Sequence, residues 1–418
     1  TAGTDLAMRN SQLALELMGQ TGLRQDGGAE KILRDAKLLQ IYEGTNQLNR
    51  VNLFKCLIRH TEGLPLPSPS GDPIPWFPGS FPGTIPGDLS GLENLAASFA
   101  AKELRGAAAT VERGPSDRLR GHVLDKARQA GFWEVFLPVT LGGAGLTALC
   151  LLLERLCRAD ASLGGVLFTN ALAQSLVMAA EGEEGISGLR GILTAFPSYA
   201  NPDVATDLPE AFPSGDGDGY SLTGRVDLLV LGDLAARAVI HARVPGGAGY
   251  SLFLVDSADP GMRKSPPILT LGLSACPAVD ATLAEVRGCP LGERDQGRRY
   301  LHSVWGPMHA ASGAMNAGIM RGACQEALDY ARTRRQGGQR ILDWGEMGMI
   351  LAGMVAKTDT AALAVSSACR CLEEGRPDGR RQAVATALQV HELACGVVDD
   401  GVQVLGGYGY KRDYDQER

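Results

Sequence analysis

The tripeptide Glu43-Gly44-Thr45 combines residue types that can hold a reactive carboxylate in place. A carboxylate in a dry pocket has a raised pKa and can act as a general base. Gly44 lets the backbone approach a ligand closely, and Thr45 can cap a following helix and so fix the direction of Glu43. Taken alone, the tripeptide is better explained as a plain helix start with a hydrated Glu43. The surrounding sequence has to decide between the two interpretations.

Arg332, Arg334, Arg335 and Arg340 form a basic cluster that suits either a solvated helix end or a bound diphosphate. The nine cysteines are scattered along the chain, at positions 56, 150, 157, 276, 289, 324, 369, 371 and 395. They form no Cys-x-x-Cys pair and join no histidine at metal-ligand spacing. We therefore expect no metal site, and reduced thiols in a cytoplasmic protein.

The composition indicates a soluble globular protein. The 418 residues are 44% hydrophobic and 21% charged, which allows two to three domains with sizeable cores. No window offers ~18 consecutive uncharged apolar residues, so we expect no membrane span. The net charge is -7 and no basic block occurs, which argues against nucleic acid as a partner.

Shifts in composition divide the chain into five segments. Residues 1–60 have a helical pattern, and residues 61–91 form a Pro-rich linker, since residues 61–90 hold 8 of the 22 prolines. Residues 92–195 have the periodicity of a helical domain. Residues 196–295 alternate short β-branched runs with turn residues, and residues 296–418 return to long helices. The expected fold is mainly α with a central β domain.

An internal repeat links the two ends of the chain. Residues 402–410 align with residues 15–23, and in the same register Glu417 and Arg418 fall on Glu30 and Lys31. We infer that residues 1–60 are the end of one module (copy one). Residues 92–418 would then be a second module (copy two) that stops before its last helix.

Residues 33–37 (Leu-Arg-Asp-Ala-Lys) and 40–50 (Gln-Ile-Tyr-Glu-Gly-Thr-Asn-Gln-Leu-Asn-Arg) resemble the C-terminal signature of acyl-CoA dehydrogenases. Copy two is similar to the same family in the order of its sequence motifs, at residues 137–145, 330–338 and 403–409. The resemblance implies an N-terminal helical domain, a middle β-barrel-like domain and a C-terminal four-helix bundle.

The resemblance also implies a reaction. Glu43 would remove a proton from the carbon next to the carbonyl of an acyl-CoA thioester, and the hydride from the next carbon would pass to FAD. Gly44, Thr45 and Gln47 would lie at that FAD. Electrons would leave through an electron-transfer flavoprotein.

In this family, as the resemblance implies, FAD lies across a dimer interface and is held partly by a neighbouring subunit. The residues with that role, the partner-side residues, map onto copy two at Arg334, Gln403, Gly406 and Gly407. Arg334 would bind the diphosphate. Copy one has Glu16 and Gln20 in place of the glutamine and the second glycine.

Copy two departs from the family where it would bind its own flavin. The departures are at residues 200–207 and 224–228, at Met308 and His309, and at Gly337, where an aromatic residue is usual. We expect copy two to be a pseudo-subunit that completes a single FAD site in an intramolecular pseudo-dimer or a homo-oligomer. The alternative is that copy two binds its own FAD through other residues.

Two other functions stay open. The first is a flavin oxidase or monooxygenase on the same fold, whose reduced form would react rapidly with oxygen. The second is a non-catalytic assembly subunit. Retained Glu43 argues against a monooxygenase. The chain has no initiator Met, and it stops at Arg418 inside the pattern of the repeat. We therefore expect it to be a piece of a longer polypeptide that is inactive alone. Residues 32–60 are expected to dock at the open end of copy two.

Overall fold

The structure is a computed structural model of the 418-residue chain. It describes residues 2–18, 28–41, 46–61, 89–104, 122–189, 191–195, 207–214, 219–268, 273, 275–409, 411 and 414. The chain forms two compact units. Unit 1 comprises Thr1–Pro82, Met320–Leu363 and His391–Arg418, and unit 2 comprises Gly83–Ile319 and Ala364–Val390. Both units therefore combine segments that are far apart in the sequence.

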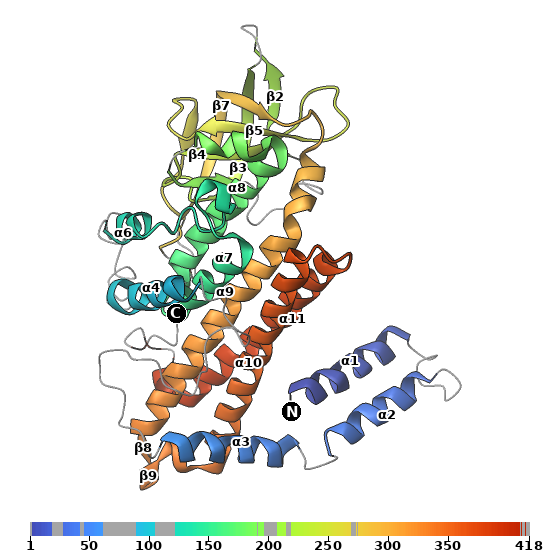
Figure 1. Ribbon diagram of the computed structural model, residues 1–418, viewed down its shortest axis with the longest axis vertical. Coiled ribbons are helices and arrows are strands. Elements are labelled where there is room, and N and C mark those ends of the chain that lie inside the picture. The colour runs from blue at the N-terminus through green and yellow to red at the C-terminus, as the bar shows by residue number, and fades with distance from the viewer. Residues whose placement is uncertain are drawn as a thin grey trace. The chain divides into compact units, whose positions relative to one another are not determined.

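Unit 2 begins with helices. Their bounds are α4 (Ser90–Phe99) with a π-helical continuation (η3, Ala100–Leu104), α6 (Leu124–Gln129), η5 (Val139–Leu141), α7 (Gly145–Cys157) and α8 (Ala161–Ser187) (Figure 1). Asp160 caps α8, because its carboxylate accepts a hydrogen bond from the Ser162 backbone N–H at 2.7 Å. The residues of α7 are mostly apolar, and nearly all of them are buried, so this helix lies inside the core of unit 2.

A seven-stranded sheet follows in unit 2. Its strands are β1 (Leu193–Ala195), β2 (Glu210–Pro213), β3 (Tyr220–Val230), β4 (Arg237–Ala242), β5 (Ser251–Asp256), β6 (Met262–Lys264) and β7 (Ala278–Leu291). Their order is β1-β4-β5-β7-β3-β2, with β6 on β7. The sheet thus starts at Leu193, two residues before the end of the range expected for the helical domain, because β1 pairs in parallel with β4. A three-residue strand is too short for periodicity to reveal.

The sheet curls toward a closed barrel. The Ala211 N–H donates to the Arg243 carbonyl at 2.8 Å, and the Arg243 N–H donates to the Pro209 carbonyl at 2.8 Å. These bonds join β2 to the residue that follows β4, so the strand path returns toward its beginning. An apolar core of β-branched, leucine and aromatic side chains fills the interior, with Phe253 and Leu222 fully buried. This arrangement agrees with the β-barrel-like domain that the resemblance implies.

Three long helices complete copy two: α9 (Gly297–Thr333), α10 (Gly345–Glu373) and α11 (Gly379–Leu405). Short elements connect or follow them: β8 (Arg335–Gln336), β9 (Gln339–Arg340), η6 (Ile341–Asp343) and η7 (Gly406–Tyr408). Each long helix contributes residues to both units. The element order confirms the expected class, mainly α with a central β domain.

Unit 1 also contains the helices of copy one, α1 (Ala2–Met18), α2 (Ala29–Leu39) and α3 (Asn46–Thr61). Arg9 of α1 forms an ion pair with Glu392 of α11 at 3.3 Å. A Cβ atom built on Gly348 of α10 would lie 2.7 Å from the Phe54 ring of α3, so this ring packs directly on the α10 backbone. The contact of Phe54 with α10 is of the kind expected if residues 32–60 dock on copy two. The linker residues 62–88 lie outside the described part of the chain.

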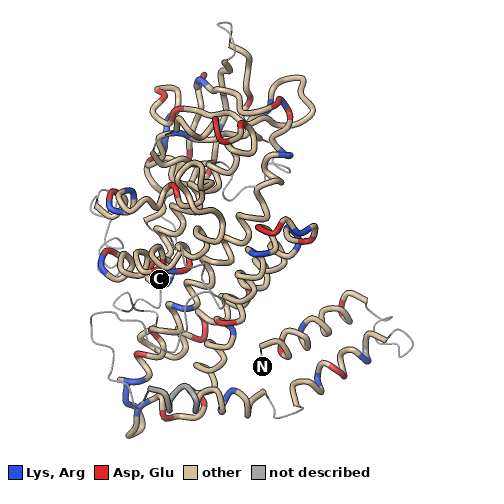
Figure 2. The backbone as a smooth tube through the Cα atoms, viewed as in Figure 1, with Lys and Arg blue, Asp and Glu red and all other residues tan. Residues whose placement is uncertain are grey.

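Within the described part of the chain, two helices, α8 and α10, are long and apolar enough to cross a membrane by length and hydropathy alone. In α8, 78% of the apolar window is buried within the protein, and in α10 the share is 50%. Core helices of a folded protein pass the same test, so burial accounts for this composition. In Figure 2, acidic and basic residues are interspersed along the described backbone and form no continuous basic stripe.

Candidate functional site

A cavity of 740 Å³ lies in unit 1, where the end of α9, the β8–β9 hairpin, the start of α10 and the end of α11 meet. All four partner-side residues line it. Its other lining residues are Tyr330, Gln336, Gly337, Ile341, Trp344, Gly345, Glu346, Met347, Val404, Leu405 and Tyr408. The fold therefore brings Arg334 to the same cavity as three residues about seventy positions later in the chain.

The β8–β9 hairpin places Arg334 at the cavity. Its strands pair Arg335 with Arg340 and Gln336 with Gln339, which leaves Gly337 and Gly338 as a two-residue loop. Both glycines have positive φ, 64° and 87°, as the favoured two-residue hairpin turn requires. The Ile341 N–H donates to the Arg334 carbonyl at 2.9 Å and closes the base of the hairpin. Any residue other than glycine would therefore have a strained backbone at position 337.

Arg334 differs from the neighbouring arginines in the partners of its guanidinium group and in its position at the cavity. Arg332 pairs with Asp329 at 3.2 Å, and Arg340 pairs with Asp343 at 2.8 Å. The Arg340 hydrogen bond holds the pKa of Asp343 below its usual value. Arg334 instead lies with its guanidinium 5.2 Å from the centre of the Tyr408 ring, and within the described residues no carboxylate forms an ion pair with it. Arg335 donates to the Gly338 carbonyl at 3.2 Å and does not line the cavity. Arg334 is thus the member of the cluster that can bind an anion in the cavity.

The end of α11 supplies the opposite wall of the cavity. Gly406 has a φ of 57°, which ends the helix in the left-handed conformation. A Cβ atom on Gly406 or Gly407 would meet no protein atom within 4 Å, so a ligand can approach this backbone. Tyr408 packs against Tyr330 and Tyr414, with ring centres 6.3 Å and 5.3 Å away. This cluster fixes the loop against α9, and burial raises the pKa of Tyr330.

The expected base and two of its neighbours, Glu43, Gly44 and Thr45, lie outside the described residues. Gln47 is described: it is exposed in the first turn of α3 and does not line the cavity. The structure therefore groups the partner-side residues and does not bring Gln47 to them. The sequence did not predict that the aromatic side chains of Tyr330, Trp344 and Tyr408 line the cavity. The available signal was that aromatic residues lie close to the glycine turns in the sequence.

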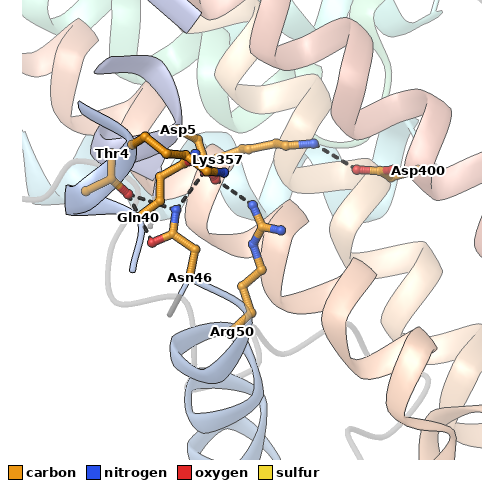
Figure 3. A network of polar contacts seen from close by, with 8 residues as sticks. Thr4, Asp5, Gln40, Asn46, Arg50, Lys357 and Asp400 are labelled. Atoms are coloured by element: carbon orange, nitrogen blue, oxygen red, sulfur yellow. Dashed lines mark hydrogen bonds and ion pairs between the residues drawn. The ribbon is translucent and has the colours of Figure 1, made fainter. Parts of the chain in front are cut away.

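A polar network surrounds the ends of the segment that contains Glu43 (Figure 3). Gln40 Nε2 and Asn46 Nδ2 each donate to Oδ1 of Asp5 at 2.7 Å. Arg50 pairs with the other oxygen of Asp5 at 2.5 Å. The Asn46 backbone N–H also donates to the Gln40 carbonyl at 2.9 Å. Residues 40 and 46 are therefore tied to each other and to α1.

The described residues contain no group of three or more His, Cys, Asp or Glu side chains that could hold a metal ion. The eight cysteines described are free thiols, and six of them are buried. Burial raises the pKa of Cys276 and of Cys324 to about 12. These thiols are protonated core residues.

Comparison with protein families matches the sequence in two parts. The acyl-CoA dehydrogenase N-terminal domain matches residues 89–185, and the acyl-CoA dehydrogenase C-terminal domain matches residues 1–57 together with 295–418. The chain belongs to the acyl-CoA dehydrogenase family. The match to the C-terminal domain therefore covers two separate stretches of the chain, one at its start and one at its end.

Individual acyl-CoA dehydrogenase relatives are distant but cover most of the chain. The caffeyl-CoA reductase–Etf complex subunit CarC of Acetobacterium woodii is 27% identical over 343 residues, 78% of this chain and 90% of the relative. The cyclohexane-1-carbonyl-CoA dehydrogenase of Geobacter metallireducens is 27% identical over 335 residues, 76% and 87%. The structure of butyryl-CoA dehydrogenase from Megasphaera elsdenii has a TM-score of 0.72 at 20% identity, covering 80% of this chain and 92% of that one. This last likeness confirms the fold.

The cofactor of the acyl-CoA dehydrogenase family is FAD, and the cavity in unit 1 fits part of it. The cavity volume lies within the usual range of roughly 300–1,000 Å³ for ligand sites. Arg334 offers a planar cation without a carboxylate partner among the described residues, which suits a diphosphate. Gly406 and Gly407 leave backbone open to close approach. The residues present therefore have the chemistry that one end of FAD requires.

Proposed function

We propose that this chain is part of an FAD-dependent acyl-CoA dehydrogenase that introduces a double bond between carbons 2 and 3 of a CoA thioester. One observation carries the proposal: Arg334, Gln403, Gly406 and Gly407 converge on a single cavity. The family resemblance assigns these four residues to the cofactor, and nothing in their spacing along the chain requires them to meet.

In the proposed reaction, Glu43 acts as the base and removes a proton from carbon 2 of the thioester. FAD, when bound, accepts the hydride from carbon 3. The chain then has three tasks: to hold the diphosphate at Arg334, to let the cofactor approach Gly406 and Gly407, and to hold Glu43 in the correct direction. The network around Asp5 supports the last task, because it ties both ends of the segment that contains Glu43.

We further propose that copy two is a pseudo-subunit, so that one FAD binds per tandem pair. Side chains at the expected flavin pocket of copy two are engaged with protein instead. Arg225 pairs with Asp227 and Asp280, and Met308 is 5% exposed in the core. His309 Nδ1 contacts the Trp305 carbonyl at 2.6 Å. In the register of the repeat Met18 of α1 aligns with Leu405 of α11, so helix aligns with helix, which supports a tandem origin.

The proposed partners are an acyl-CoA substrate and an electron-transfer flavoprotein. The relative from Acetobacterium woodii is a subunit of a reductase–Etf complex, which supports the second of these. That relative is a reductase and the Geobacter relative is a dehydrogenase, so hydrogen transfer has to be measured in both directions.

The test is an acyl-CoA panel on the intact polypeptide, with a matched pair of variants. Oxidation of saturated thioesters is followed with an electron-transfer flavoprotein as acceptor, and reduction of the corresponding enoyl thioesters is followed in reverse. Glu43→Gln should lower kcat by roughly 100-fold or more without loss of bound FAD. Glu374→Gln, at an exposed glutamate between α10 and α11, should leave kcat unchanged.

Each alternative gives a different result. Turnover that is unchanged in Glu43→Gln would indicate an assembly subunit, and fast oxidation of the reduced enzyme by oxygen would indicate an oxidase. Two bound FAD per polypeptide would rule out the pseudo-subunit.

A further inference from the structure

Two buried thiols from different helices of unit 2 face each other. Cys150 lies on α7 and Cys369 lies on α10, and their Sγ atoms are 3.5 Å apart. The Cys369 thiol donates a weak hydrogen bond to Cys150. Cys150 is 0% exposed and Cys369 is 1% exposed. Two residues that are 219 positions apart in the sequence thus bring their reactive atoms together.

A carboxylate fastens the same two helices to each other one turn away. Glu373, at the end of α10, accepts a hydrogen bond from the Thr147 backbone N–H at 3.0 Å and another from the Thr147 hydroxyl at 2.8 Å. Thr147 lies in the first turn of α7, so the carboxylate also meets the positive end of that helix. The contact between the two thiols is therefore made by side chains on backbone that is already held in place.

The other described cysteines are not paired in this way. Cys324 contacts the Thr358 hydroxyl at 3.2 Å, and Cys289 and Cys395 are exposed. Among the cysteines that the structure describes, no other two thiols lie within hydrogen-bond distance of each other. Any chemistry that needs two neighbouring thiols is therefore expected at Cys150 and Cys369.

The surroundings of the pair select the kind of reagent that can react with it. The hydrogen bond from Cys369, together with burial, raises the pKa of Cys150 well above its usual value. Reagents that require an exposed thiolate should therefore react first with Cys289 and Cys395. A small uncharged oxidant can enter when α7 and α10 separate briefly, and it then finds the second thiol next to the first.

We propose that Cys150 and Cys369 form a redox-sensitive clasp, in which hydrogen peroxide converts the two thiols into a disulfide that ties α7 to α10. Peroxide first oxidises one thiol to a sulfenic acid, and one water leaves. The second thiol attacks that sulfur, its proton leaves with the sulfenic oxygen as a second water, and the S–S bond forms. The two thiols together lose two electrons and two protons, and peroxide takes up both.

The disulfide changes the stability of the fold. The sulfur atoms have to approach from 3.5 Å to ~2.05 Å, which side-chain rotation and a small helix shift can supply. Because the bond joins residues 219 positions apart, it closes a long loop in the unfolded chain and reduces the conformational freedom of that chain. The oxidised protein should therefore resist unfolding more than the reduced protein, and a reductant should reverse the difference.

The test treats the intact, folded protein with hydrogen peroxide and maps its disulfides by peptide mass spectrometry. The wild type should give one cross-linked peptide that contains Cys150 and Cys369 and is lighter by two hydrogen atoms than the two reduced peptides together. It should also migrate faster on a non-reducing gel. The melting temperature should rise by roughly 5 °C or more and should return to its starting value after reduction with dithiothreitol.

Cys369→Ala and Cys289→Ala form the matched pair of variants. Cys369→Ala should lose the cross-linked peptide, the change in gel mobility and the rise in melting temperature. Cys289→Ala removes an exposed thiol and should keep all three. Since a buried substitution can lower stability by itself, the oxidised form of each variant is compared with its own reduced form.

Two results would overturn the proposal. In the first, peroxide oxidises the exposed thiols of Cys289 and Cys395 and leaves Cys150 and Cys369 reduced in the folded protein. In the second, the cross-linked peptide appears only after the protein has been unfolded in denaturant, so that the native contact does not direct the reaction.

Discussion

Asn46, the first residue of α3, donates from its side-chain amide to the Asp5 carboxylate of α1 at 2.7 Å. Because Gln40 donates to the same oxygen at 2.7 Å, one carboxylate holds the two residues that flank the segment with Glu43. Asp5 is half-buried, and its second oxygen pairs with Arg50. This geometry makes Asp5 a candidate positioning residue for the proposed base.

We expect Asp5→Asn to lower kcat by roughly tenfold with little change in KM, because a displaced base loses alignment while the substrate pocket is kept. The measurement is steady-state kinetics on the intact polypeptide. Asp35→Asn, which removes an exposed ion pair with Lys31, is the control and should have wild-type kcat. A purely structural role would lower the melting temperature of Asp5→Asn and leave kcat per bound FAD unchanged.

Arg334→Ala should weaken FAD binding by roughly 10- to 100-fold, because it removes a charge-assisted contact to the diphosphate. Arg334→Lys should recover only part of the loss, since lysine lacks the planar fork. Equilibrium dialysis against FAD gives both values. Arg335→Ala is the matched control, because its guanidinium donates to the Gly338 carbonyl at 3.2 Å and does not line the cavity. Equal losses in both variants would mean that only net charge matters.

The hairpin glycines allow a paired stability test. Gly337→Ala and Gly338→Ala both place a Cβ atom on a residue of positive φ, which costs about 1 kcal/mol each. Only at 337 would the new atom meet Trp344, at 2.9 Å, whereas at 338 it meets nothing within 4 Å. Gly337→Ala should therefore unfold at a lower denaturant concentration than Gly338→Ala. Identical midpoints would show that the indole moves away freely.

The buried thiols should make the protein less stable in alkali. Burial raises the pKa of Cys276 and Cys324 from 9.0 to about 12. Between these values the unfolded chain loses the thiol protons and the folded protein keeps them. The free energy of unfolding therefore falls as pH rises above 9, by up to about 1.4 kcal/mol per pH unit for each thiol.

Denaturant titrations from pH 7 to 11 measure this effect. Cys276→Ala should show a shallower decline than the wild type, and Cys289→Ala, which alters an exposed cysteine, should not. A decline of equal slope in both variants would assign the effect to other groups.

The local sequence determined which elements form. Glycine and proline positions, together with the switch between helical and strand periodicity, located the β-rich segment and the segment of long helices that follows it, because these signals act within a few residues. The family signature likewise identified the partner-side residues from their neighbours. Tertiary structure decided which of these residues share a site.

Arg334 and Gln403 meet only because α9 and α11 pack so that their ends lie at one cavity. Asp5 and Asn46 likewise meet only because α1 and the start of α3 lie together. Contacts of this kind depend on side-chain volume and on direction across elements that are far apart in the chain. No spacing within the sequence carries that information.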